Sequence, residues 1–118
     1  MPEQEFEVIF YQRENETAPA LEFIEGCEIK MQAKILGHLE ILQQRGYELR
    51  EPYSKPLEDG IFELRTKQGS NISRVLYFFF VGKKIVLTNG FIKKTQKTPK
   101  SEIEKAKKYR QDYLERMK

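Results

Sequence analysis

The sequence predicts an α+β fold, in which an N-terminal helical hairpin and a C-terminal helix pack on a roughly four-stranded, mainly antiparallel sheet. Apolar residues recur every three or four positions from residue 21 to residue 42, which is the period of a helix with one buried face. Between residues 61 and 92, three runs rich in β-branched and aromatic residues are separated only by short turns. Such runs are typical of an antiparallel meander, and we expect helices to cover one of its faces.

The N-terminal half is expected to form one strand and then helix. Phe6, Val8 and Phe10 alternate with other residues and predict a short strand, and Thr17 followed by Pro19 predicts a helix start. The apolar stripe that follows consists of Leu21, Ile24, Cys27, Met31, Ile35, Leu39 and Leu42. This stripe indicates a helix face that packs in the core, and not a catalytic site.

The two glycines in this region, the loop that follows it and its single histidine each lead to a further expectation. Gly26 and Gly37 can interrupt the stripe, so a hairpin is expected in place of one continuous rod. Residues 47–60 contain two prolines and mixed charges and predict a surface loop. His38 is the only histidine and has no cysteine or second histidine near it in the sequence. We therefore expect it to be a surface or boundary residue and not a catalytic one.

The C-terminal half is expected to form the meander. Alternation over residues 61–66 places Glu63 and Arg65 on the face opposite Phe62 and Leu64. Residues 68–71 predict a turn, and Arg74 follows on the same side of its strand as Ile72, Leu76 and Phe78. Gly82 and Lys83 predict a tight hairpin. In the last strand, period two places Ile85, Leu87 and Phe91 on one face and Val86, Thr88 and Ile92 on the other.

A helix is expected after the basic segment at residues 93–97. Thr98 can cap this helix, and Pro99 suits its first position because the missing N–H would be unpaired there. Ser101 and Glu104 offer a competing capping box.

Composition predicts one domain over residues 1–118, with 39% apolar and 12% aromatic residues. The single Cys27 cannot form an internal disulfide and has no ligand spacing for a metal. No apolar run approaches the roughly 18 residues of a membrane span, and the acidic N-terminus lacks the basic region of a signal peptide. We expect a cytoplasmic protein with no membrane contact.

The charges are unevenly distributed along the chain. Residues 1–59 hold six Lys/Arg against 13 Asp/Glu, a balance of −7, whereas residues 60–118 hold 15 against five, a balance of +10. This asymmetry favours a basic working face for a polyanion or an acidic partner, although a solvated charged surface is the alternative.

The candidate functional residues are basic side chains. The sequence has no paired-carboxylate site, no glycine-rich phosphate loop and no metal cluster. Arg65 and Arg74 are expected on adjacent strands, near Lys93 and Lys94 at the end of the third. An arginine within an aromatic strand is costly to bury unpaired, so Arg74 either has a structural partner such as Glu63 or binds a phosphate. For the lysine pair, a solvated strand end is the alternative to a function.

Two segments, SKPLEDGIFELRTK at residues 54–67 and SRVLYFFFVGKKIVLTNGFIKKTQKTPKSEIEKAKKYRQDY at residues 73–113, carry a family pattern. They resemble the RelE/ParE toxin superfamily, and most closely its HigB-like, phage-associated branch. The matching residues are Lys55, Leu57, Gly60, Phe62, Glu63, Leu64, Arg65, Arg74, Tyr77, Phe91, Lys93, Lys94, Thr95, Lys97, Thr98, Pro99 and Ala106.

The resemblance implies the toxin of a type II toxin–antitoxin pair, an endoribonuclease that cuts mRNA on the ribosome and halts translation. In that family the ribose 2′-hydroxyl attacks its own adjacent phosphate, with no metal or other cofactor. The implied catalytic residues are Arg74, Arg65, Lys93 and Lys94. The implied RNA-binding residues are Lys55, Lys67, Lys97 and Lys100.

The helix at the C-terminus ends without the histidine or aromatic tail of some members. Tyr109 and Tyr113 are therefore candidates for proton transfer, with core packing as their alternative role. The implied partners are the ribosome, mRNA and a cognate antitoxin, expected to be a helix-turn-helix, HigA-like protein whose acidic segment covers the basic face. Two other functions remain open: a ParE-like toxin that binds DNA gyrase, and a basic nucleic-acid-binding protein without catalysis.

Overall fold

The computed structural model describes residues 5–93 and 97–118 and confirms the α+β class. One mixed sheet has the strand order β1-β5-β4-β3-β2. Its strands are β1 (Glu7–Phe10), β2 (Ser54–Pro56), β3 (Phe62–Gln68), β4 (Asn71–Phe80) and β5 (Lys84–Lys93). β1 is parallel to β5, and the other neighbours are antiparallel. The sheet has one strand more than predicted, because Ser54–Pro56 in the expected loop pairs with β3.

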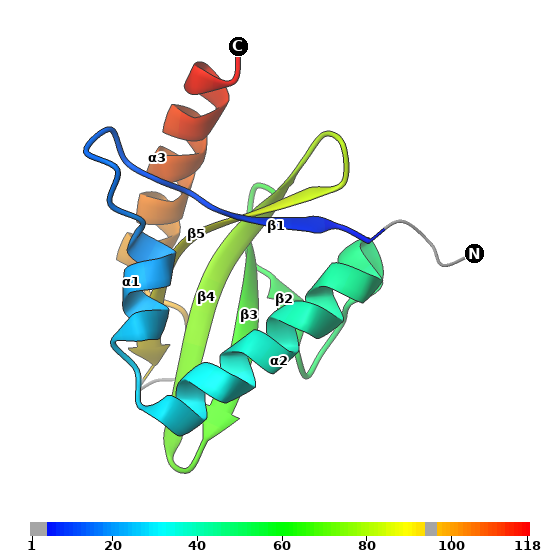
Figure 1. The fold of residues 1–118 in the computed structure, drawn as a ribbon, viewed down its shortest axis with the longest axis vertical. Helices are drawn as coiled ribbons and strands as arrows, with labels where there is room; N and C mark the ends of the chain where they lie inside the picture. Colours follow the sequence, from blue (N-terminus) through cyan, green and yellow to red (C-terminus); the bar gives the residue numbers. More distant parts are fainter. Residues whose placement is uncertain (1–4, 94–96) are drawn as a thin grey trace.

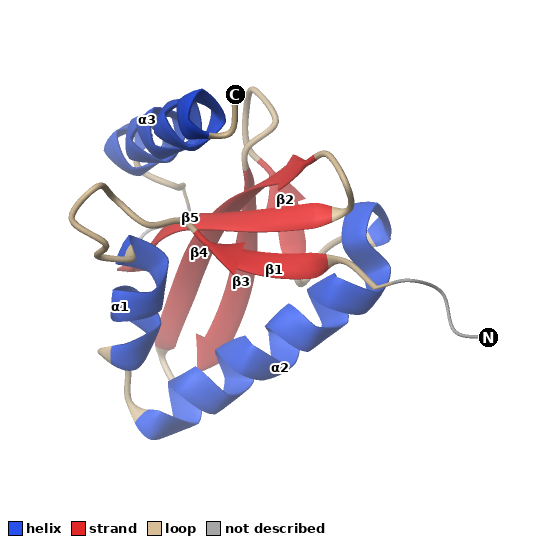
Figure 2. Ribbon diagram, turned by 45° about the horizontal axis from the view of Figure 1, so that its top comes forward, coloured by secondary structure: helices blue, strands red, loops and turns tan. Residues whose placement is uncertain are grey.

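The helices lie on both faces of the sheet, where we expected one face to be covered. α1 (Pro19–Glu25) and α2 (Ile29–Arg45) cover one face, and α3 (Lys100–Arg116) lies against the other (Figure 1, Figure 2). The predicted break at Gly26 is confirmed, since this residue follows the last residue of α1. Gly37 does not interrupt α2.

Each face of the sheet has its own core. The core under α1 and α2 joins both helices to three central strands and includes Ile24, Ile35, Leu64, Val75, Tyr77, Ile85 and Leu87. The core under α3 includes Ile61, Leu76, Phe78, Val86, Ala106 and Tyr113. Arg74 has the strand parity of Leu76 and Phe78, as predicted, and the sheet turns its side chain toward the α3 face.

A β-bulge in β5 changes the face of the residues that follow it. Leu76 pairs with Asn89 but Tyr77 pairs with Leu87, which leaves Thr88 as the extra residue. The Thr88 hydroxyl donates a hydrogen bond to the Leu76 carbonyl at 3.2 Å. Beyond the bulge, Phe91 packs in the α3 core, on the face opposite Ile85 and Leu87. The predicted common face for these three residues is therefore wrong, because an extra residue shifts the two-residue period.

Candidate active site

Arg65 and Arg74 lie directly opposite each other on β3 and β4. Like charges in this position repel, and one carboxylate offsets the repulsion. Glu63 is 1% exposed, with Oε1 at 3.6 Å from Arg74 Nε and Oε2 at 3.8 Å from Arg65 Nε. Glu63 is therefore the structural partner that the sequence suggested for Arg74, and it binds both guanidiniums.

Arg74 is not satisfied by that partner. Its side chain is 2% exposed, and Nε and Nη1 have no hydrogen-bond acceptor in the part of the chain that the structure describes. Burial lowers its pKa, Glu63 raises it, and the Arg65 charge lowers it again. Since a guanidinium stays protonated in proteins, these two buried donor nitrogens remain available for a further acceptor.

The bulge in β5 brings Lys93 to the same region. Lys93 lies opposite Ile72 in the register and lines a cavity with Glu63, Thr98 and Lys97. Burial lowers the Lys93 pKa, and repulsion from Arg74 lowers it further, while Glu63 acts in the opposite direction. Two guanidiniums and this ammonium thus face one buried carboxylate, and the cluster has an excess of positive charge. We call Arg65, Arg74, Lys93 and Glu63 the cation cluster.

The start of α3 is attached to the cation cluster. Thr98 Oγ1 donates a hydrogen bond to Glu63 Oε1, and Thr98 is 7% exposed. The cap position of the helix is Pro99, without a side-chain capping bond, and Ser101 lies inside the helix. The predicted caps are therefore wrong, because the buried carboxylate takes the Thr98 hydroxyl, and a charged acceptor forms the stronger hydrogen bond.

An open cavity of about 670 Å³ adjoins the two arginines. Its lining includes four cationic side chains, Lys34, Arg65, Lys67 and Arg74, together with His38 and uncharged residues such as Tyr53 and Ile72. Glu51 contributes a carboxylate, which lies 4.0 Å from Arg65 Nη1. A cationic concavity beside buried guanidinium donors is suited to an anionic group such as a phosphate.

His38 is half-buried, as expected for a boundary residue, and it also lines this cavity. Its Nδ1 lies 3.1 Å from the Arg65 carbonyl and 3.0 Å from Thr66 Oγ1. Because a carbonyl oxygen only accepts, Nδ1 carries the proton of that bond and Nε2 keeps its lone pair. Burial lowers the His38 pKa, the bond to the Arg65 carbonyl raises it, and Lys34 lowers it further.

Tyr53 also belongs to the cavity and was missed in the sequence. Its ring is 5.0 Å from the His38 ring in an edge-to-face contact, and its carbonyl accepts a hydrogen bond from the Arg65 amide at 2.7 Å. Both residues are placed by the packing of α2 and the loop before β2 on β3. The sequence offers no local signal for such long-range packing.

The predicted RNA-binding lysines lie around these features. Lys55 on β2 is exposed and pairs across strands with Glu63. Lys97 is exposed at the same cavity as Lys93, and Lys67 is exposed at the larger cavity. Lys100 is exposed, with Nζ at 4.0 Å from a Glu58 oxygen. Lys94 lies outside the described residues.

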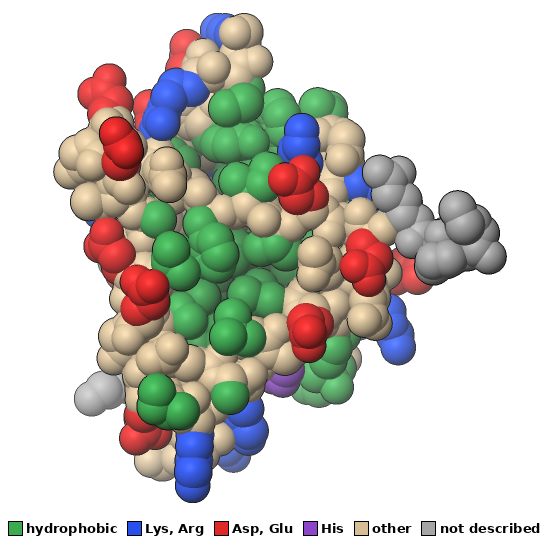
Figure 3. All heavy atoms as spheres, in the orientation of Figure 1, with side chains coloured by type: hydrophobic (Ala, Val, Ile, Leu, Met, Phe, Trp, Pro, Cys, Tyr) green, Lys and Arg blue, Asp and Glu red, His purple; other side chains and the backbone are tan. Residues whose placement is uncertain are grey.

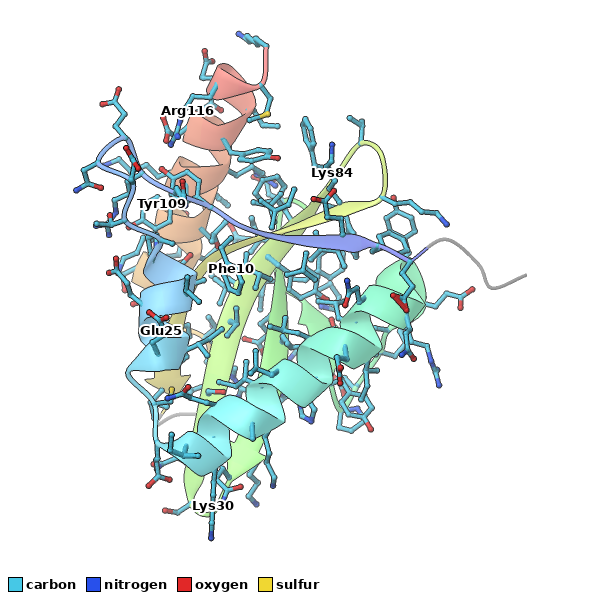
Figure 4. The ribbon with its side chains drawn as sticks, in the orientation of Figure 1. Phe10, Glu25, Lys30, Lys84, Tyr109 and Arg116 are labelled. Carbon is cyan, nitrogen blue, oxygen red and sulfur yellow. The ribbon has the colours of Figure 1, made fainter. Side chains whose placement is uncertain are left out.

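The predicted proton-transfer tyrosines have packing partners farther along α3. The Tyr109 hydroxyl accepts a hydrogen bond from Arg13 at 2.8 Å, and its ring stacks on Tyr11 beside the loop between β1 and α1 (Figure 4). Tyr113 is 8% exposed and contacts Phe78 and Phe80 edge to face. Ile103 lines the Lys93 cavity, and at about 1.5 Å per residue Tyr109 lies roughly 9 Å beyond it along the helix. The structure therefore does not bring these tyrosines to the cation cluster.

Within residues 5–93 and 97–118, no group of three or more His, Cys, Asp or Glu side chains could hold a metal ion. In the same ranges, no helix is long and apolar enough to cross a membrane.

The chain matches one protein-family model, and the matched region contains the segments that carry the cation cluster. A family model described as phage-derived protein Gp49-like (DUF891) matches residues 22–111, which include α2 and all strands except β1. A search of curated proteins gave no match.

Proposed function

Since the chain belongs to the family of Gp49-like phage-derived proteins, which is part of the RelE/HigB-like toxins of toxin–antitoxin systems, we propose that it cleaves mRNA on the ribosome. It would act as the toxin of a type II pair, held inactive by a cognate antitoxin. Its cleavage of mRNA would stop translation.

One observation carries the proposal. Arg74 is almost fully buried, yet two of its guanidinium nitrogens have no acceptor among the residues described, and it adjoins a cavity that also holds Arg65, Lys34 and Lys67. An unpaired buried donor is costly, so a protein keeps such a group where a ligand supplies the acceptor. The non-bridging oxygens of an RNA phosphate are acceptors of the right charge and geometry.

The reaction transfers a phosphoryl group within the RNA, from the 5′-oxygen of one nucleotide to the 2′-oxygen of its neighbour. The 2′-oxygen forms a bond to phosphorus, the bond from phosphorus to the 5′-oxygen breaks, and the products are a 2′,3′-cyclic phosphate and a free 5′-hydroxyl. Arg74 and Arg65 would hold the non-bridging oxygens while charge develops on them. A base must remove the 2′-proton, and an acid must protonate the leaving oxygen.

Lys93 is the described residue best suited to proton transfer within the cation cluster. Its lowered pKa makes proton release easier near neutral pH than for a solvated lysine. His38 is a second candidate, because its Nε2 lone pair belongs to a side chain that lines the cavity. Lys94, Tyr109 and Tyr113 remain candidates from the sequence.

The test is mRNA cleavage on programmed ribosomes by the wild type, Arg74→Ala, Arg74→Lys and Arg65→Ala. Loss of one transition-state contact should lower the cleavage rate by about 10²–10³-fold. Lysine should restore little, because it lacks the planar fork. Lys108→Ala, an exposed change on α3, is the control. Thermal unfolding of each variant separates lost catalysis from lost folding, and a folded Arg74→Ala with wild-type cleavage would sink the proposal.

Metabolic labelling distinguishes the rival toxin. Induced expression without an antitoxin should stop protein synthesis first. If DNA synthesis stops while protein synthesis continues, the gyrase-binding function replaces mRNA cleavage.

A further inference from the structure

A second surface lies on the face of the molecule that carries α1, α2 and β1. Figure 3 shows apolar side chains gathered in the middle of this face, between the two helices, and Phe10 lies near its centre in Figure 4. Between β1 and α2 the surface opens into a cavity of about 490 Å³ lined by Val8, Phe10, Leu36 and Gly37. Leu36 is 52% exposed. We call this cavity the β1–α2 groove.

The backbone of β1 is available at this groove. β1 is the first strand in the sheet order of the described residues and pairs only with β5. The Glu7 and Tyr11 amides donate to the Lys83 and Leu87 carbonyls at 2.9 and 3.0 Å. Since successive residues of a strand turn their backbone groups to opposite edges, the N–H and C=O groups of Val8 and Phe10 are directed to the outer edge. An extended peptide can pair with such an edge.

The border of the apolar surface is acidic. In Figure 3 carboxylates lie along both sides of the apolar side chains, with Lys and Arg side chains toward the top and bottom of the view, and Glu25 lies at one border in Figure 4. Three exposed residues contribute to this border: Glu40, which lines the groove, and Glu22 and Glu25 on α1. Repulsion makes this face unsuited to RNA, and complementarity favours a partner with lysines or arginines beside its apolar residues.

We propose that the β1–α2 groove binds an extended segment of the antitoxin, which adds a strand to β1, places apolar side chains against Leu36 and Phe10, and sets basic residues opposite the carboxylates. The proposal rests on the toxin–antitoxin assignment and is independent of RNA cleavage. The antitoxin would then dock on the face away from the cation cluster, in contrast to the acidic cover expected from the sequence.

The experiment uses the purified chain and the small protein encoded by the adjacent gene, with binding measured by calorimetry. Leu36→Lys places a charge in the groove at an exposed position and should raise the Kd at least about tenfold. Glu40→Lys should weaken binding as well. Leu114→Lys on α3, where the side chain is 37% exposed, is the matched control and should bind as the wild type does. Lys55→Glu on the opposite face should also keep its affinity.

Hydrogen exchange provides the second measurement. The Val8 and Phe10 amides should exchange more slowly in the complex than in the free chain. Wild-type affinity for Leu36→Lys, with affinity lost in Lys55→Glu, would overturn the inference and leave the proposed function standing. A neighbour that fails to bind the wild-type chain would overturn the antitoxin assignment itself. If the chain alone forms a dimer that Leu36→Lys dissociates, the occupant is a second copy and the inference is wrong.

Discussion

At the scale of single residues, Glu63 offsets the positive charge of the two arginines that face each other across β3 and β4. It is the buried carboxylate between Arg65 and Arg74, and it also accepts the Thr98 hydroxyl that fixes the start of α3. A buried ion pair adds little over an apolar pair, but removal of one partner leaves the other charge without compensation. Glu63 therefore has a structural role that differs from the proposed catalytic role of Arg74.

Glu63→Gln should lower the free energy of unfolding by about 3–5 kcal/mol. The reason is that Arg74 keeps its charge in a buried site with no counter-ion. Urea unfolding gives the measurement, and Glu104→Gln is the control, since Glu104 is an exposed partner of Lys107 on α3 at 3.6 Å. A Glu63→Gln variant as stable as the control would show that the guanidiniums do not depend on this carboxylate.

His38 makes stability depend on pH. Its pKa is lowered in the folded protein, mainly by burial, so below pH 6.5 the unfolded chain takes up a proton that the folded chain resists. The stability from this group is present above the unfolded pKa and is lost as the pH falls toward the folded one, with a slope of at most about 1.4 kcal/mol per pH unit. His38→Gln should flatten the decline in unfolding free energy between pH 7 and pH 5. An unchanged slope would exclude His38 as its source.

At the scale of elements, replacement of two glycines by alanine should change the stability in opposite directions. A Cβ on Gly90 in β5 would lie 2.4 Å from the Phe23 ring, whereas a Cβ on Gly37 in α2 would meet nothing within 4 Å. Gly90→Ala should cost about 1–3 kcal/mol, because α1 must move from the sheet. Gly37→Ala should add about 0.5–1 kcal/mol by helix propensity. Thermal unfolding of the two variants checks both signs, and a stabilising Gly90→Ala would contradict the close approach of α1.

The elements also differ in how well they could be predicted from the sequence. Strong local patterns predicted β4, the turn before it and the face of Arg74, and they brought Arg65 and Arg74 together. The bulge at Thr88 could not be predicted, because one extra residue leaves no mark on the composition and yet reverses Phe91. β2 has only three residues and exists by pairing with β3. His38 and Tyr53 reach the cavity through tertiary packing of α2 and a loop, which no local period records.

At the scale of the whole molecule, the charge asymmetry of the sequence becomes a difference between two surfaces. The first half of the chain, with a balance of −7, supplies the acidic border around the β1–α2 groove. The second half, with +10, supplies Arg65, Arg74, Lys93 and Lys97. One surface is thus suited to a basic protein segment and the other to a polyanion, so both partners could be recognised without competition for the same charges.

The last prediction concerns this basic surface. On single-stranded RNA, each phosphate that a lysine neutralises contributes about −0.7 to the slope of log affinity against log salt. If Lys55, Lys67 and Lys97 each contact one phosphate, affinity for an RNA oligonucleotide should fall about 20-fold between 50 and 200 mM salt. Lys97→Ala should reduce the slope by about 0.7, because one contact is lost. Lys118→Ala should leave the slope unchanged, since Lys118 follows the far end of α3, where its Nζ lies 3.4 Å from Glu115 Oε1. Fluorescence anisotropy gives the affinities, and a binding constant that stays flat over this range would remove the polyanion as partner of the cation cluster.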